Sequence, residues 1–227
     1  MKEKIINIFK TSTFKQTLIT SSGTILSGIF GLVYYILSAR ILEPVGFGVF
    51  SVSTATIVEG VLSLFTNNPR RDRDYMHSIK IEMGRERKNL RNFVYSDNSP
   101  LREYYLNCND LIIYTLVKNY FNAVSETLWI NDDRSYIRKT VGIQALFDLL
   151  RKICTTALNS KDITKEYFLE LLTPCKKINF SDNFIQASGK GRQRIRNCLE
   201  YKLKLKSKED LKSEIADYIR LCDLENI

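Results

Sequence analysis

The chain of 227 residues has few of the side chains from which metal sites and catalytic sites are usually built. It contains one histidine, His77, and no CxxC or CxxH pair. Protein zinc sites use closely spaced pairs of this kind, and nucleophilic catalysis needs a base beside the nucleophile. We therefore expect no metal, no cofactor and no enzymatic activity. The five cysteines lie more than twenty positions apart, at Cys108, Cys154, Cys175, Cys198 and Cys222.

The cysteine pattern is unlike the disulfide framework of a small secreted protein, because the count is odd and the spacing is wide. We expect reduced thiols in a cytosolic region. The N-terminus also differs from a secretory signal peptide. Its apolar part is longer than the usual ~7–15 residues, and no clear small-x-small cleavage site follows it.

Charge is missing between Gln16 and Ala39, where no Asp, Glu, Lys, Arg or His occurs. At a rise of ~1.5 Å per residue, a helix of this length crosses a hydrocarbon layer of ~30 Å. Lysines precede the run and Arg40 follows it, and flanks rich in Lys and Arg are typical of the cytoplasmic side. We predict a transmembrane helix over residues 16–39 with a cytoplasmic N-terminus. The alternative is a buried helix of a soluble protein.

A second apolar run extends from Val45 to Phe65 and is interrupted by Glu59. A carboxylate is costly in mid-bilayer, so Glu59 is expected near the interface. If this second span, residues 45–65, leads back to the cytoplasm, the basic residues that follow lie on the side that the charge rule requires. In the first run, small residues recur every four positions and predict close packing against another helix. These residues are Gly23, Ser27 and Gly31.

The two runs are joined by ARILEPVGFGVFS, residues 39–51. This phrase and the apolar residues before it resemble the start of polysaccharide (O-antigen type) flippases of the multidrug/oligosaccharidyl-lipid/polysaccharide exporter superfamily. In that family the first helix ends in a phrase like ARxLGPxxFGxFS, and Glu43 stands where glycine is common. The resemblance covers residues ~10–60 and implies a role in polysaccharide biosynthesis at a bacterial inner membrane. Those transporters have many more spans, so two helices are not expected to transport alone.

Charge is distributed unevenly along the chain. Of the 34 Lys and Arg and the 25 Asp and Glu, only five and three, respectively, lie in residues 1–69. The composition changes abruptly near Phe65. We predict a membrane segment over residues 1–66 and a basic soluble region over residues 67–227. The charged stretch 70–92 is either a solvated helix face or a contact for an anionic partner, a lipid headgroup or nucleic acid.

Apolar residues at helical spacing predict further helices over residues 110–130, 136–160, 164–172 and 207–224. Asp110 and Ser207 are expected to cap the first and last of these helices, and Pro174 to end the third. Strand patterns are weak. The expected fold class is mainly α, with two N-terminal transmembrane helices followed by a basic, mostly helical cytosolic region.

The stretch most open to chemistry is ASGKGRQRIRN, residues 187–197. Its glycines allow backbone N–H groups to approach an oxyanion, and its cations suit a phosphate. The spacing is not that of a Walker A loop. The residues predicted to contact phosphate or nucleic acid are Gly189, Lys190, Gly191, Arg192, Arg194 and Arg196. The alternative is a solvated loop that leads into a basic helix.

A second resemblance rests on YIRKTVGIQALFDLLR, residues 136–151, and on SGKGRQRIRN. Both resemble the C-terminal region of DGQHR-domain proteins, which are similar to regulators associated with DNA phosphorothioation. The resemblance covers residues ~66–227 and implies DNA contact by the four cations of the second phrase, if the family uses that loop on DNA. The Asp-Gly-Gln-His-Arg motif itself is absent, because His77 is flanked by Met76 and Ser78.

Three functions remain open at this point. The first is a membrane-inserted protein related to polysaccharide flippases, not transport-competent alone, that carries a DGQHR-like region. The second is a membrane-tethered or soluble nucleic-acid-binding regulatory protein. The third is an oligomerising component of a polysaccharide exporter, which the small-residue strip of the first span supports. The expected partners are a lipid bilayer and, for the second and third functions, DNA and other transmembrane helices.

Overall fold

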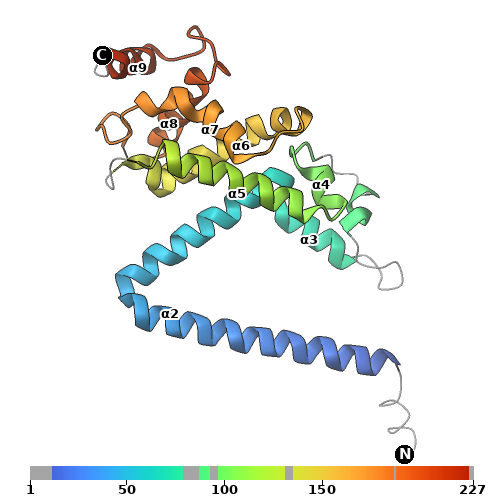
Figure 1. Cartoon of the computed structure of the whole chain (residues 1–227). Helices are drawn as coiled ribbons and strands as arrows, with labels where there is room; N and C mark the ends of the chain where they lie inside the picture. Colours follow the sequence, from blue (N-terminus) through green and yellow to red (C-terminus); the bar gives the residue numbers. More distant parts are fainter. Residues whose placement is uncertain (1–11, 79–86, 93–96, 131–134, 187, 225–227) are drawn as a thin grey trace, which may run out of the picture. The chain divides into compact units, whose positions relative to one another are not determined.

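The computed structural model describes residues 12–78, 87–92, 97–130, 135–186 and 188–224, with side chains from residue 30 onward except at positions 44, 45 and 47. Within these ranges the chain forms helices and turns and no strand, which confirms the mainly α class (Figure 1). The chain divides into two compact units, Met1–Val52 and Ser53–Ile227. This division does not test the expected end of the membrane segment at residue 66, which stays a prediction.

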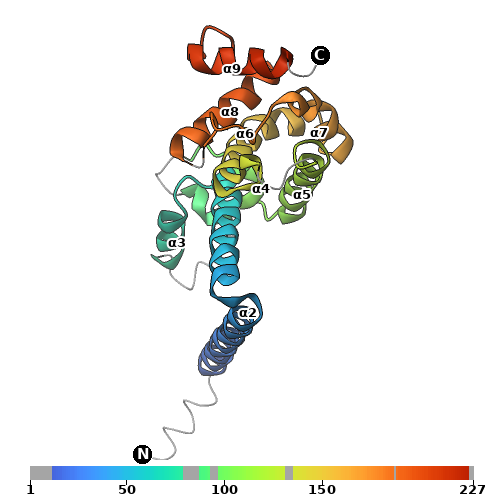
Figure 2. The ribbon, with the colours of Figure 1, turned by 90° about the vertical axis from the view of Figure 1, so that its left-hand side faces the viewer.

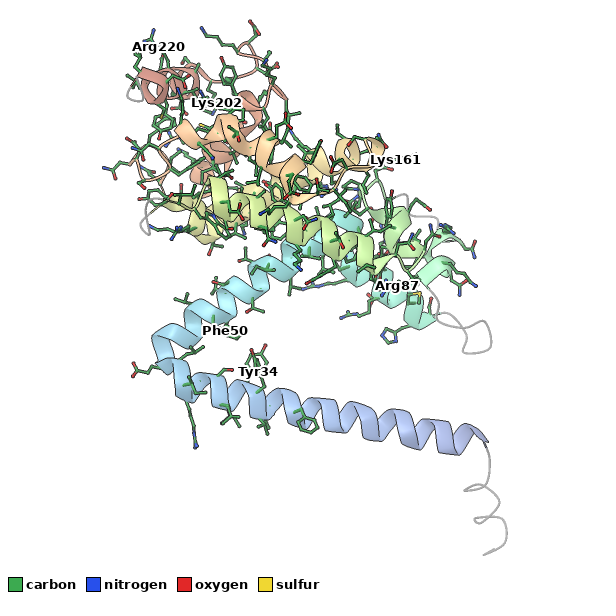
Figure 3. All side chains as sticks on the ribbon, viewed as in Figure 1. Tyr34, Phe50, Arg87, Lys161, Lys202 and Arg220 are labelled. Atoms are coloured by element: carbon green, nitrogen blue, oxygen red, sulfur yellow. The ribbon has the colours of Figure 1, made fainter. Side chains whose placement is uncertain are left out.

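The described part of the first unit is one long helix with a break. Helix α2 (Ser12–Phe65) is interrupted at Glu43, which has φ 58° and ψ 169°. This backbone conformation is nearly exclusive to glycine, and a residue before proline is pushed out of the helical region. The break therefore separates two arms, and in Figure 3 Tyr34 and Phe50 face each other across it, with ring centroids 6.3 Å apart.

The second unit includes the end of α2. A Cβ atom on Gly60 would lie 2.2 Å from the Phe147 ring, so only glycine allows this approach. Leu64 is fully buried, and its carbonyl accepts a hydrogen bond of 2.8 Å from the Leu101 amide. Residues 60–65 therefore belong to the packing of the second unit, although the sequence assigned them to a membrane span.

The remaining helices build the second unit around one apolar core. Helix α5 (Asp110–Thr127) packs against α7 (Lys165–Leu172), and α6 (Thr140–Asn159) packs against α8 (Gly189–Lys202), as both ribbon views show (Figures 1 and 2). Tyr120, fully buried at the centre, donates a hydrogen bond of 2.9 Å to the Leu146 carbonyl, so its hydroxyl is satisfied. The helices are α3 (Pro69–Ser78), η2 (Arg87–Asn92), α4 (Arg102–Leu106), α5 (Asp110–Thr127), η3 (Tyr136–Arg138), α6 (Thr140–Asn159), α7 (Lys165–Leu172), η4 (Thr173–Lys177), α8 (Gly189–Lys202) and α9 (Ser213–Leu224).

A buried ion pair joins α3 to α4. The Arg102 guanidinium binds both carboxylate oxygens of Asp72, and its Nη2–Oδ1 distance is 3.0 Å. The same guanidinium donates to the Phe65 carbonyl at 3.3 Å and lies 3.9 Å from the Asp97 carboxylate. Asp72 and Arg102 are only 5% and 7% exposed. Helices α3 and α4 are therefore held at the end of α2 by an ion pair as well as by apolar contacts.

Some helices begin at other residues in the structure than the sequence predicts. Asp110 is the first residue of α5 and pairs with Arg87, and the capping position is occupied by Asn109. The last helix begins at Ser213, because the Ser207 hydroxyl binds the Asp210 carboxylate at 2.7 Å within a preceding turn. Pro174 follows the end of α7, as predicted, and is the second residue of η4. Of the charged stretch 70–92, residues 79–86 lie outside the described residues.

Candidate functional site

The apolar surface of α2 is the most extensive candidate for a function. All six residues from Leu32 to Leu37 are exposed. Six consecutive residues cover every side of a helix with ~3.6 residues per turn. A helix that faces water on one side and a core on the other has apolar residues on one side only. Exposed large apolar side chains along α2 are Phe30, Leu32, Val33, Tyr34, Tyr35, Ile36, Leu37, Ile41, Leu42, Val49, Val52, Ile57 and Val58.

One segment within the described side chains, Gly48–Phe65, is long and apolar enough to cross a membrane. It lies within the second predicted span, residues 45–65. The prediction of two spans is not confirmed, because the side chains of residues 16–29 in the first predicted span lie outside the described ones. The same limit applies to Gly23 and Ser27 of the predicted packing strip. At Gly31 a Cβ atom would meet no described atom within 4 Å.

The predicted phosphate-binding residues all lie in the first turns of α8. This helix begins after Ser188, whose hydroxyl accepts a hydrogen bond of 3.3 Å from the Gly191 amide. A Cβ atom on Gly191 would lie 1.9 Å from the Gln186 carbonyl oxygen, whereas one on Gly189 would meet nothing within 4 Å. Gly191 is therefore explained by a close backbone approach, and one of the amides expected to cradle an oxyanion already has a partner.

The arginines of this stretch are engaged within the second unit. Arg192 binds both carboxylate oxygens of Asp148, at 2.8 and 2.6 Å. Its hydrogen bond to that carboxylate raises the pKa of Arg192. Arg194 lies over the Phe184 ring, with its guanidinium carbon 4.2 Å from the ring centroid, and donates to the Phe184 carbonyl. These contacts hold α8 against α6 and against the loop before α8.

Arg196 occupies the centre of a charged cluster between α6 and α8. It lies 3.7 Å from the Asp148 carboxylate and 3.6 Å from that of Glu200. Glu200 is 2% exposed and is held by Lys152 at 2.8 Å. The sequence analysis missed both acids; the signal that could have revealed one of them is the four-residue spacing of Arg196 and Glu200, typical of helical ion pairs. Lys190, the remaining predicted cation, is exposed.

A cavity of about 430 Å³ opens beside this cluster. Three cations line it, and the carboxylate of Asp148 lies among them. The Arg151 guanidinium donates to the Asn67 side-chain oxygen. An added phosphate would therefore compete with carboxylates and amides that already bind these cations, and the predicted phosphate contact stays a prediction. The lining residues are Asn98, Pro100, Asp148, Arg151, Lys152, Thr155 and Arg196.

The described residues contain no group of three or more His, Cys, Asp or Glu side chains close enough to hold a metal ion. His77 lies exposed at the end of α3. The expectation that the chain uses no cofactor stays a prediction.

The cysteines are expected to differ sharply in reactivity. Cys108 is exposed and the other four are buried. Burial raises the pKa of Cys154 to about 11 and that of Cys175 and Cys198 to about 12, which removes the reactive thiolate. At about pH 8, near the ordinary thiol pKa, a thiol-specific reagent should label the folded chain at Cys108 alone and all five cysteines in denaturant. Rapid labelling of Cys198 in the folded chain, detected by peptide mass spectrometry, would contradict this burial.

Comparisons of the chain with protein-family models, with curated proteins and with solved structures gave no match. The two resemblances in the sequence therefore stay predictions.

Proposed function

We propose that α2 inserts into a membrane and holds the helical unit Ser53–Ile227 at the membrane surface. The observation that supports this function best is the apolar surface that surrounds α2 from Leu32 to Leu37 and continues on Ile41, Leu42, Val49, Val52, Ile57 and Val58. Exposed apolar patches of this extent are characteristic of membrane or protein contacts. Lipid can cover every side of a helix at once, which a single packed partner cannot.

The two arms of α2 differ in the length that they offer to lipid. The first arm, Ser12–Leu42, has 31 residues and is ~46 Å long at ~1.5 Å per residue. The second arm offers lipid only Pro44 to Glu59, because Gly60 and the residues after it pack within the second unit. These 16 residues measure ~24 Å, less than a hydrocarbon layer of ~30 Å. The second arm can therefore cross the membrane only if Gly60 and the residues after it lie at the edge of the hydrocarbon layer.

The remaining details of the proposal come from the sequence. The lysines before residue 16 and the arginines after Phe65 favour a cytoplasmic location for both flanks of a two-span hairpin. The flippase-like phrase favours a bacterial inner membrane and a role beside polysaccharide export. Transport by this chain alone is not proposed, because two arms enclose no pathway. DNA binding is less favoured, since Arg192, Arg194 and Arg196 are engaged by carboxylates and a carbonyl.

The experiment is carbonate extraction of the full chain synthesised in the presence of phosphatidylglycerol–phosphatidylcholine vesicles. The wild-type chain should remain with the vesicles. Lysine in the centre of a span costs about 2.5–3.5 kcal/mol on insertion scales, so two lysines shift insertion by roughly a thousandfold or more. If both arms insert, the double variants Val33→Lys/Leu37→Lys and Val49→Lys/Val52→Lys should each stay with the vesicles through the unchanged arm, and the variant that combines all four lysines should be released.

The matched control is Leu205→Lys/Leu221→Lys, which adds the same charge at exposed apolar positions outside α2. This variant should stay with the vesicles. Release of the second-arm variant with retention of the first-arm variant would limit insertion to the second arm. Release of the wild-type chain would refute the proposal.

A further inference from the structure

An apolar groove lies where α2 enters the second unit. It has a volume of about 300 Å³, at the lower end of the ~300–1,000 Å³ of ligand pockets. Val61 and Phe65 of α2 form one wall, and Ile113, Tyr114 and Val117 of α5 form the other. The Phe65 ring stacks on Tyr105, with centroids 4.5 Å apart. Ile57, one turn before Val61 on α2, is exposed, so the groove continues the apolar surface of that helix.

The chemistry of the groove favours an occupant without hydrogen-bonding groups. Its two charged lining residues, Arg87 and Asp110, are bound to each other at 2.5 Å. The guanidinium of Arg87 also lies 4.7 Å from the centre of the Tyr105 ring. A peptide backbone in this groove would need partners for its N–H and C=O groups, and the walls are apolar side chains on helices whose own backbone groups are paired. A hydrocarbon chain has no such requirement.

The outer edge of α5 has the character of a membrane interface. Leu111 is 75% exposed and Tyr114 is 60% exposed, three positions apart on one helix face. The Lys118 ammonium lies 5.6 Å from the centre of the Tyr114 ring, one turn further on. Tyrosine favours the headgroup level, and lysine extends its ammonium toward phosphate while its stem stays on apolar surface. Lys118 is thus placed to meet an anionic headgroup at the edge of the groove.

The length of the second arm gives an independent reason for lipid at this level. The ~24 Å from Pro44 to Glu59 falls short of a ~30 Å layer, so a spanning second arm draws Gly60 to Phe65 to the hydrocarbon boundary. The groove is built on Val61 and Phe65. It therefore lies at the depth where acyl chains meet headgroups.

We propose that this groove, between the end of α2 and the face of α5, binds one acyl chain of an anionic phospholipid whose phosphate is met by Lys118. The inference rests on the proposed membrane insertion of α2. It adds a specific lipid site on the helical unit, which an anchor by itself does not require.

The test uses the full chain in carbonate-washed vesicles that contain phosphatidylglycerol with a photoactivatable diazirine on one acyl chain. Crosslinks are mapped by peptide mass spectrometry. We expect crosslinks on α2 and also on the peptides of residues 105–117. Val117→Trp should fill the groove and reduce the second set about tenfold, the change expected when a chain loses contact for about two buried methylenes. Lys118→Gln should reduce the preference for phosphatidylglycerol over phosphatidylcholine.

Two controls keep the outcomes distinct. Ile130→Trp adds the same side chain at an exposed position outside the groove and should leave all crosslinks unchanged. Far-ultraviolet circular dichroism shows whether Val117→Trp unfolds the helical unit. If it does, the variant Tyr114→Ser is used instead, because it removes part of one groove wall at an exposed position, and it should also reduce the crosslinks on residues 105–117. Carbonate retention is measured on every variant and reports on α2 separately.

Retention with crosslinks on α2 but none on residues 105–117 would overturn the lipid site and leave the membrane anchor intact. Disappearance of the lipid crosslinks on residues 105–117 when the protein-to-lipid ratio is raised would overturn it as well, in favour of a second copy of the chain as the occupant. Loss of retention in the wild-type chain would refute both proposals together. If Val117→Trp leaves the crosslinks on residues 105–117 unchanged, lipid contacts this surface without binding in the groove, and the proposed lipid site is wrong.

Discussion

Replacing Asp72 by alanine is expected to lower the free energy of unfolding of the helical unit by about 3–5 kcal/mol, the usual effect of removing one partner of a buried ion pair. Asp72 and Arg102 are both nearly fully buried, and the alanine leaves the guanidinium with Asp97 at 3.9 Å, the Phe65 carbonyl and the Tyr105 ring, whose centre lies 5.9 Å away. The loss arises from an uncompensated buried charge more than from the missing attraction. It should appear in denaturant unfolding of the detergent-solubilised chain, followed by the fluorescence of Trp129, the single tryptophan.

The control for this variant lies on the same helix. Arg73 and Asp74 form an ion pair of 3.2 Å with both side chains about two thirds exposed, so Asp74→Ala should change stability by less than about 1 kcal/mol. The double variant Asp72→Ala/Arg102→Met removes both charges and should recover most of the loss. Equal effects of Asp72→Ala and Asp74→Ala would show that the pair between α3 and α4 is not buried in solution.

Gly191→Ala is expected to destabilise the helical unit by about 3 kcal/mol, at the upper end of the range for an overpacked site. The new Cβ atom would lie 1.9 Å from the Gln186 carbonyl oxygen and 2.5 Å from that of Ile185, and backbone atoms cannot move aside as a flexible side chain can. The start of α8 would have to shift. The Ser188 cap and the Arg192–Asp148 ion pair depend on that position, so the same denaturant experiment should show a lower midpoint.

Gly189→Ala is the matched control, two residues earlier in the same helix. Its Cβ atom meets nothing within 4 Å, and alanine is a better helix former than glycine, so stability should be unchanged or slightly higher. If the glycines serve a bound phosphate, both substitutions should weaken binding while stability changes little. Equal stability of the two variants would contradict the close backbone approach at Gly191.

Local sequence patterns predicted the helical elements well. The apolar positions of residues 110–130 and 136–160 correspond to α5 and α6, because a buried face at a 3.6-residue period has few alternatives. The ends were less accurate. Asp110 was expected as a cap and is the first helical residue, because Arg87, distant in sequence, binds its carboxylate. The start of α9 moved to Ser213 because Ser207 and Asp210 form a turn of their own.

The basic stretch shows why a site is harder to predict than a helix. Its charges and glycines are visible in the sequence, but their partners are not. Asp148 lies 44 positions before Arg192, and the carbonyl that approaches Gly191 belongs to a loop. A pattern that suits phosphate is equally suited to binding α6, and only the fold brings those carboxylates to the arginines.

Periodicity and composition act locally, so the printed sequence alone predicts that the chain is helical and that its first third is apolar and poor in charge. The other features came from the tertiary structure. It placed residues 60–65 in the packing of the helical unit through Gly60 and Leu64, although the segment Gly48–Phe65 is by length and composition able to cross a membrane. It also paired the arginines of α8 and opened an apolar groove beside α2, because contacts between distant segments depend on shape and on charge compensation that no local pattern encodes.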